Sequence, residues 1–228
     1  MRLMAAAGFN TVFVGIETPD DNALAECSKS QNRNRDLVSS VKKLQKMGLQ
    51  VMGGFIVGFD SDDDTIFERM IEFIQQSGIV TAMVGLLQAP IGTQLYQRML
   101  REGRIRNDYS GDNVDGETNI LPKMDIAVLK QGYRKILDSI YSAKGFYDRV
   151  RTFLKDYNPA QRPVTLQWEE ISALFSSMFR IGIKSKERKH YWRLFFWTLF
   201  NYPKKFPLAI TFTIYGYHFR KVNELHVI

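Results

Sequence analysis

Cysteine is nearly absent from this sequence of 228 residues, in which Cys27 is the single example. One thiol excludes an internal disulfide framework, and it cannot alone hold a cysteine-ligated iron–sulfur cluster. The three histidines stand far apart, without the spacing that zinc sites use. The sequence therefore predicts no metal site within this chain and indicates a reducing compartment.

Long apolar runs are also missing. No stretch reaches about 18 uninterrupted apolar residues, so no transmembrane helix is predicted. The first residues show no signal-peptide pattern, and we expect a cytoplasmic protein. Hydrophobic residues still make up 45% of the chain, and 16 Phe, 10 Tyr and 3 Trp require burial. This composition predicts a folded chain of one large or two smaller domains.

Charge is distributed unevenly. Residues 1–120 hold 12 basic and 16 acidic residues, a net charge of −4, whereas residues 121–228 hold 19 and 8, a net charge of +11. The asymmetry indicates two regions with different tasks, the second facing an anionic partner. Solvated lysines on an ordinary helical domain explain the same excess.

Three short apolar segments alternate with helical patterns in the first half of the chain. Their β-branched and aromatic residues are typical of buried parallel strands. Apolar residues at helical spacing follow each of them, and the units repeat at about 35 residues, the length of a βαβ crossover. We therefore predict an α/β fold with a parallel sheet. The predicted strands are Thr11–Glu17, Val51–Phe59 and Thr81–Gln88, and the predicted helices are 36–47, 65–76 and 92–103.

The strand–helix alternation ends after residue 108. The polar segment Tyr109–Thr118 predicts a loop, and helical patterns follow it. We therefore divide the chain into an α/β domain, residues 1–108, and an all-helical domain, residues 109–228. The predicted helices of the second domain are Ile126–Ala143, Tyr147–Lys155, Trp168–Ile183, Arg188–Phe200 and Pro207–Phe219, the last of which is also compatible with a strand.

Glycine and polar residues stand where the three predicted strands end, and ligands bind at such ends of parallel sheets. Glu17 can accept hydrogen bonds from ribose hydroxyls or an ammonium group, or can form a salt bridge. Gly54 and Gly58 admit a ligand close to the strand backbone, or tight helix packing. The turn Pro90–Thr93 presents backbone groups to a planar ring, or is an ordinary strand-to-helix turn.

In order and spacing, these segments resemble the second half of the barrel of radical S-adenosylmethionine (SAM) enzymes. Gly15-Ile-Glu-Thr18 resembles the fourth strand, which meets the ribose and methionine of SAM, and Gly54-Phe-Ile-Val-Gly58 resembles the G-x-I-x-G motif of the fifth. Leu86–Tyr96 resembles the sixth strand, whose end contacts adenine largely through its backbone. The resemblance implies SAM-binding roles for Gly15, Glu17, Thr18, Gly54, Ile56, Gly58, Gln88, Ala89 and Pro90.

The sequence departs from that family in two places. Asp60-Ser-Asp62 stands where the fifth-strand motif ends in proline, glycine and an acid, so Asp62 is the candidate for the acid. The C-x-x-x-C-x-x-C motif that holds the [4Fe–4S] cluster is absent. The resemblance implies that the cluster-binding part precedes Met1 in a longer protein, and that this chain alone is inactive.

The second half of the chain is similar to the helical region that follows the barrel in cobalamin-binding radical SAM proteins, a group that includes hopanoid methylases. The matching segments are Thr118–Pro122, Gly132–Tyr141, Tyr147–Arg149 and Gly216–Phe219. The resemblance implies a partial parallel barrel with a helical C-terminal region, in a cobalamin-dependent radical SAM methyltransferase. SAM is the cofactor expected here, whereas the cluster and cobalamin are expected in the missing part.

Several alternatives stay open at this point. The chain is also compatible with a tRNA-modifying radical SAM enzyme, or with a non-catalytic remnant or scaffold. The basic, aromatic segment Lys184–Phe206 suits a core helix, a contact with an anionic membrane surface, or, less well, nucleic acid. The expected substrate is a small molecule or a lipid, and the expected location is cytoplasmic or peripheral to a membrane.

Overall fold

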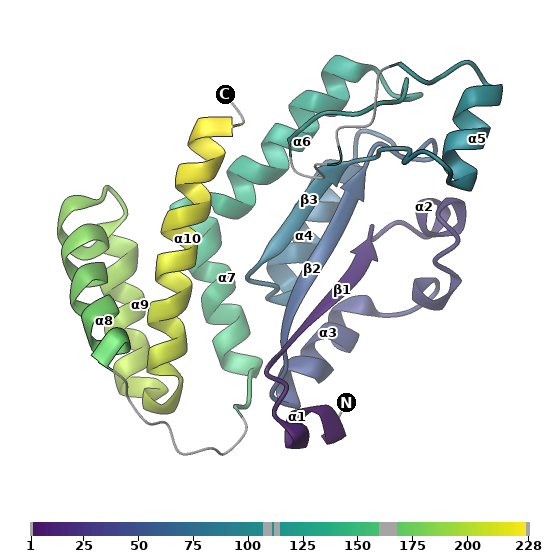
Figure 1. Ribbon diagram of the computed structural model, residues 1–228. Coiled ribbons are helices and arrows are strands. Elements are labelled where there is room, and N and C mark those ends of the chain that lie inside the picture. Colours follow the sequence, from purple (N-terminus) through teal and green to yellow (C-terminus); the bar gives the residue numbers. More distant parts are fainter. Residues whose placement is uncertain (1, 107–110, 112–114, 160–167, 227–228) are drawn as a thin grey trace.

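The computed structural model describes residues 2–106, 111, 115–159 and 168–226. Its three strands are all parallel and form one sheet in the order β1-β2-β3 (Figure 1). Their bounds are β1 Thr11–Glu17, β2 Gln50–Val57 and β3 Ala82–Leu86. The predicted α/β fold with a parallel sheet is confirmed, although three strands are not enough to establish a barrel. The predicted boundary at residues 108–109 and part of the predicted loop lie outside the described residues.

Local signals explain where the helices of the first half begin and end. The carboxylate of Asp36 accepts a hydrogen bond from the backbone N–H of Ser39 and caps one helix. Gly78, at φ 70°, ends another in the left-handed conformation that glycine adopts readily. The helices of this half are α1 Arg2–Ala7, α2 Asp21–Glu26, η1 Ser30–Asn32, α3 Leu37–Lys46, α4 Ile66–Ser77 and α5 Gln94–Arg101.

The two faces of the sheet differ in their cover. Side chains along β2 alternate between buried and partly exposed positions, because α3 and α4 pack on one face of the sheet (Figure 1). On the opposite face Phe13 is 60% exposed and Met83 is 43% exposed. This second face therefore has no comparable layer of helices within the described chain.

The second half is helical, as predicted. The helix predicted to begin at Tyr147 begins at Ala143, because the Ser142 hydroxyl caps it by accepting from the backbone N–H of Gly145. The helix predicted to reach Ile183 passes into a π-helical turn. The bounds are α6 Ile126–Tyr141, α7 Ala143–Asp156, α8 Trp168–Phe179, η2 Arg180–Lys184, α9 Arg188–Asn201, η3 Pro203–Lys205 and α10 Phe206–His226.

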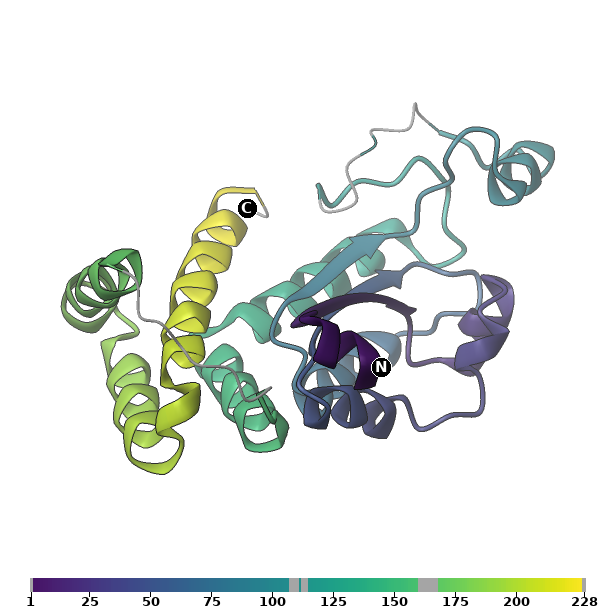
Figure 2. The ribbon, with the colours of Figure 1, turned by 60° about the horizontal axis from the view of Figure 1, so that its bottom comes forward.

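One hydrophobic core runs from the sheet into the helices of the second half. It joins Val84 of β3 and Ile74 of α4 to Ile136, Phe146 and Phe212 of α6, α7 and α10. Two views show α8, α9 and α10 standing beside the sheet rather than over it (Figures 1 and 2). The open face of the sheet is therefore left accessible by the fold.

Candidate functional site

A cavity of about 300 Å³ lies on the open face of the sheet, toward the carboxyl ends of the strands. We refer to it as the strand cleft. It contains six of the nine residues that the sequence predicted for SAM binding, drawn from all three predicted segments. They are Gly15, Glu17, Gly54, Ile56, Gln88 and Pro90, and the other lining residues are Phe13, Phe55, Met83, Gly85 and Leu86.

Glycines form the floor of the strand cleft. Gly15 lies opposite Gly54 in the register of β1 and β2, and Gly85 of β3 lies opposite Ile56. A Cβ atom on Gly54 would stand 2.9 Å from the ring of Phe13, so a larger residue would displace that ring. Glycine within a strand weakens it, and it often marks a bulge, a bend or a place where another group approaches the backbone closely. The Phe13 ring thus packs over Gly54, and the Glu17 carboxylate lies over Gly15, so a ligand would lie against these side chains rather than directly on the glycines.

Glu17 stands at the rim of the strand cleft in an unusual backbone conformation. The pairing of β1 with β2 shifts register between Gly15 and Glu17, and Glu17 has a φ of 69°. Such irregularities are frequent beside binding sites, where they re-aim a side chain. The Glu17 carboxylate, 16% exposed, forms an ion pair with the Lys29 ammonium at 2.9 Å. A carboxylate and an ammonium group are thus held together at the end of β1.

Three predicted residues are absent from the lining of the strand cleft. Thr18 is fully buried, and its hydroxyl accepts a hydrogen bond from the backbone N–H of Asp20. Gly58 has a φ of 101°, where a side chain would be strained, and a Cβ there would stand 3.0 Å from Leu129. Ala89 is fully buried. Burial or backbone conformation thus accounts for the residue type at each of the three positions. The predicted roles of these residues in SAM binding stay predictions.

Asn119 is a residue whose importance the sequence did not show. Its amide accepts a hydrogen bond from the Ala89 N–H at 2.8 Å and donates one to the Ala89 carbonyl at 2.9 Å. Asn119 is 3% exposed, and the adjoining Ile120 pairs with Ile105 in an antiparallel bridge. Asn119 therefore replaces a missing strand partner for the segment that ends the strand cleft. The one signal in the sequence was that Asn119 is a polar residue within Thr118–Pro122, a segment that matches the helical region of cobalamin-binding radical SAM proteins.

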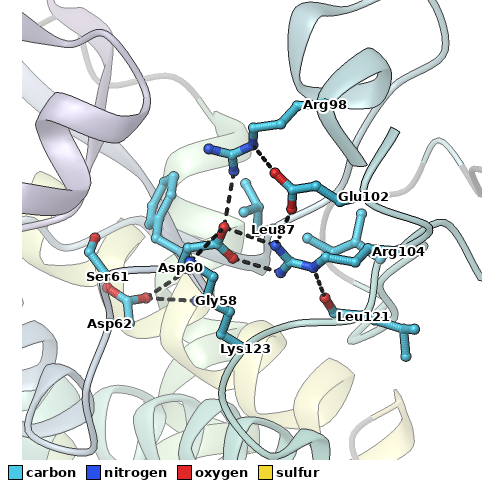
Figure 3. Close-up of polar contacts among 12 residues, drawn as sticks. Gly58, Asp60, Ser61, Asp62, Leu87, Arg98, Glu102, Arg104, Leu121 and Lys123 are labelled. Atoms are coloured by element: carbon cyan, nitrogen blue, oxygen red, sulfur yellow. Dashed lines mark hydrogen bonds and ion pairs between the residues drawn. The ribbon is translucent and has the colours of Figure 1, made fainter. Parts of the chain in front are cut away.

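Asp62 closes the turn after β2. One carboxylate oxygen accepts hydrogen bonds from the backbone N–H groups of Gly58, at 2.8 Å, and Phe59, at 3.0 Å (Figure 3). The other oxygen, Oδ1, is buried and has no partner among the described residues. Burial raises the pKa of Asp62 to about 6, against the two backbone hydrogen bonds, which lower it. Asp62 thus holds the glycine end of the fifth-strand-like segment in place.

Asp60 ties the same turn to α5 and the segment after it. Its carboxylate accepts hydrogen bonds from the Arg104 guanidinium at 2.6 and 2.9 Å and lies 3.4 Å from Arg98 (Figure 3). The hydrogen bond from Arg104 holds the pKa of Asp60 below its usual value, in spite of burial. The charged side chains of this cluster, Asp60, Arg98, Glu102 and Arg104, contact one another in Figure 3, so we assign them a structural role.

Replacing Asp62 with asparagine is expected to stabilise the protein more at neutral than at acidic pH. The folded-state pKa of about 6 exceeds the unfolded value of 3.8, so the ionised carboxylate destabilises the folded state above pH 6. This destabilisation decreases as the pH falls and the carboxylate takes up a proton. Asparagine keeps an acceptor for both N–H groups and has no charge. The stability difference should shrink by roughly 1–3 kcal/mol between about pH 7.5 and about pH 4 in urea denaturation.

Asp63→Asn is the matched control for that measurement. Hydrogen bonds from Thr65 lower the pKa of the exposed Asp63, so its ionised form favours folding and the pH trend should reverse. A difference between wild type and Asp62→Asn that stays constant across the range would contradict the burial argument.

Comparison with known proteins places the chain in a family. The model of a domain of unknown function, DUF4070, matches residues 93–227. The chain belongs to this family. The domain is found in cobalamin-dependent radical SAM methylases, so the resemblance to the C-terminal region of these proteins is confirmed. The matched residues include Asn119, which contacts the end of the strand cleft.

Relatives of the chain are named as methyltransferases. An uncharacterized methyltransferase of Synechocystis is 33% identical over 99% of this chain and 43% of its own length. The hopanoid C-2 methylase of Rhodopseudomonas palustris is 40% identical over 50% of this chain and 22% of its own length. The bacteriochlorophyllide d C-12(1)-methyltransferase of Chlorobaculum tepidum is 29% identical over 66% of this chain and 33% of its own length. The chain thus spans less than half the length of these relatives.

Proposed function

We propose that this chain is the SAM-binding and substrate-shaping portion of a radical SAM methyltransferase that also uses cobalamin. The observation that carries the proposal is the strand cleft, where Gly15, Glu17, Gly54 and Gln88 from three separate segments come together. The similarity of the chain to named methyltransferases supports it. In this reading the three strands are part of a parallel barrel, and the α/β and helical regions divide near residue 108.

The residues of the strand cleft fit SAM chemically. The methionine part of SAM carries an ammonium and a carboxylate, and the Glu17–Lys29 pair offers the opposite charge to each. Both charged groups lie above Gly15, since a Cβ there would stand 2.6 Å from Glu17 Oε1 and 3.4 Å from Lys29 Nζ. The Phe13 ring, which packs over Gly54, offers an aromatic surface on which a ring system can stack. When bound, SAM supplies the methyl group or the radical precursor that such enzymes use.

The chain does not by itself fit the iron–sulfur cluster. It has one cysteine, and burial raises the pKa of the Cys27 thiol, which disfavours the thiolate that a cluster needs. The described residues also contain no group of three or more His, Cys, Asp or Glu side chains arranged to hold a metal ion. We therefore assign no electron-transfer step to residues of this chain.

Binding of SAM is expected to depend on Glu17. Titration calorimetry of the chain with SAM should show binding, and Glu17→Gln should weaken it about tenfold, since a charge-assisted hydrogen bond contributes about 1.5–3 kcal/mol. Glu68→Gln is the control, because Glu68 on α4 forms an exposed ion pair with Lys135 of α6 and does not line the strand cleft. Equal loss in both variants, or no binding by the wild type, would contradict the proposed role.

We also propose that the basic, aromatic segment contacts an anionic membrane surface. Tyr191, Leu194 and Thr198 bury one side of α9, whereas Phe196 and Phe200 on its other side are 49% and 78% exposed. Exposed aromatics beside basic residues suit the interface of an anionic bilayer. No helix in the described parts of the chain has the length and apolarity to cross a membrane.

Co-sedimentation with vesicles tests that contact. Vesicles containing phosphatidylserine should bind the wild type at low salt and release it at high salt. The variant Phe200→Ser, altered at the ring that is 78% exposed, should bind more weakly with little loss of stability. The double variant Lys144→Gln/Lys155→Gln, which removes two positive charges on α7 outside the segment Lys184–Phe206, tests whether net charge alone accounts for binding. Binding that is unchanged in the serine variant would contradict the aromatic contact.

A further inference from the structure

A second cavity, of about 310 Å³, lies where β3 meets α6 and α10. We refer to it as the helix cavity. Its volume is at the lower end of the roughly 300–1,000 Å³ of small-molecule sites, and its walls are mostly apolar. The lining residues are Met52, Thr81, Ala82, Met83, Val84, Tyr133, Leu137, Tyr141, His218, Phe219, Val222 and Asn223.

Two residues of its lining each carry a polar atom that is buried without a partner among the described residues. Thr81 is 5% exposed, and its hydroxyl oxygen forms no hydrogen bond with the described residues. The Asn223 amide donates to Asp138 at 3.2 Å, while its Oδ1 is buried and has no partner among the same residues. The carboxylate of Asp138 determines which way the amide is turned, because the opposite orientation would bring two acceptors together. An unpaired buried polar group costs about 1–3 kcal/mol and calls for an explanation.

The chemistry of the lining selects the kind of molecule that would satisfy these atoms. Asn223 Oδ1 only accepts hydrogen bonds, and the Thr81 hydroxyl accepts or donates one, so a ligand needs a donor group. The lining contains no Lys, Arg, Asp or Glu to neutralise a charged ligand, whose transfer into apolar surroundings is costly. An uncharged hydroxyl group on an apolar body meets both conditions.

We propose that the helix cavity binds an uncharged, apolar molecule through a hydroxyl group that hydrogen-bonds to Thr81. Met83 lines both the helix cavity and the strand cleft, so the two cavities share a wall. The bound molecule thus lies beside the place assigned to SAM. Its role as the methyl acceptor rests on the proposed function, whereas its binding does not.

Farnesol, a prenyl alcohol, is the probe for the helix cavity, and it is titrated in the absence of SAM. Wild-type protein should bind farnesol, and Thr81→Val, which removes the hydroxyl at nearly constant volume, should weaken binding about tenfold. Thr198→Val is the matched control, because Thr198 is fully buried, has an unpaired hydroxyl in the described structure and lines neither cavity. This control should bind farnesol as the wild type does. The hydrocarbon farnesene should bind the wild type about tenfold more weakly than farnesol.

A second variant separates binding from folding. Val222 is 38% exposed on α10, so Val222→Trp fills the helix cavity from a position where the fold tolerates a larger residue. It should abolish farnesol binding while its thermal unfolding stays near that of the wild type. Absence of farnesol binding up to its solubility limit, or equal binding by Thr81→Val and Thr198→Val, would overturn the proposal. Neither result bears on the SAM titration, so failure of this site and failure of the proposed function are distinguishable.

Discussion

Replacing Asn119 with alanine is expected to lower the free energy of unfolding by about 2–4 kcal/mol. The variant leaves the N–H and carbonyl of Ala89 without their present partners, at a position that is fully buried. Each unsatisfied buried group costs about 1–3 kcal/mol, and water has little access there. Urea denaturation followed by circular dichroism measures the loss.

The same variant should also affect the strand cleft. Gln88 and Pro90, on either side of Ala89, line that cleft, so loosening Ala89 should weaken SAM binding several-fold. Asn201→Ala is the control, because the Asn201 amide makes one local hydrogen bond, to the Trp197 carbonyl, at an exposed site. If the two variants lose the same stability, the bridging role assigned to Asn119 is wrong.

Replacing Arg149 with alanine is expected to cost about 3–5 kcal/mol of stability. Arg149 is fully buried on α7, and its guanidinium donates to the carbonyls of Ile140, at 2.8 Å, and Val80, at 3.3 Å. It joins the last turn of α6 to the residues just before β3. The guanidinium also lies over the rings of Tyr141 and Phe146, at 5.8 and 5.3 Å from their centroids.

The buried charge of Arg149 reduces the stability that this residue contributes. No acidic side chain pairs with it in the described structure, and burial lowers its pKa to about 10, so the buried cation is itself unfavourable. Arg149→Met fills much of the space and removes that charge, and it should therefore lose clearly less stability than Arg149→Ala. Thermal unfolding of the two variants tests this order. A methionine variant as unstable as the alanine variant would show that the hydrogen bonds to Ile140 and Val80 outweigh packing and charge.

Periodicity along the chain was sufficient to predict the parallel sheet and the longer helices, whereas the short helices α2 and η1 were not predicted. Strands such as β1 and β3 could be located from local sequence, since their apolar runs are short and bounded by turn residues, although β1, predicted to be buried, is mostly only partly buried. The predicted meeting of strand ends in one cleft holds for Glu17, Gln88 and Pro90, because the carboxyl ends of successive parallel strands share an edge, but Gly58 does not line that cleft. Family membership also followed from these segments and the helical region after them.

Other features depend on contacts between distant parts of the chain. Asn119 bonds to Ala89 across 30 positions, and the pairing of Arg149 with the Val80 carbonyl spans 69. The helix cavity combines β3 with α6 and α10, so its unpaired oxygens on Thr81 and Asn223 are meaningful only once those elements pack. The sequence by itself determined which segments are strands and helices and which residues end the strands, because these depend on neighbours within a few positions. Only the tertiary structure decided which polar groups are satisfied and which face a cavity, because hydrogen bonding and burial are properties of residues brought together by folding.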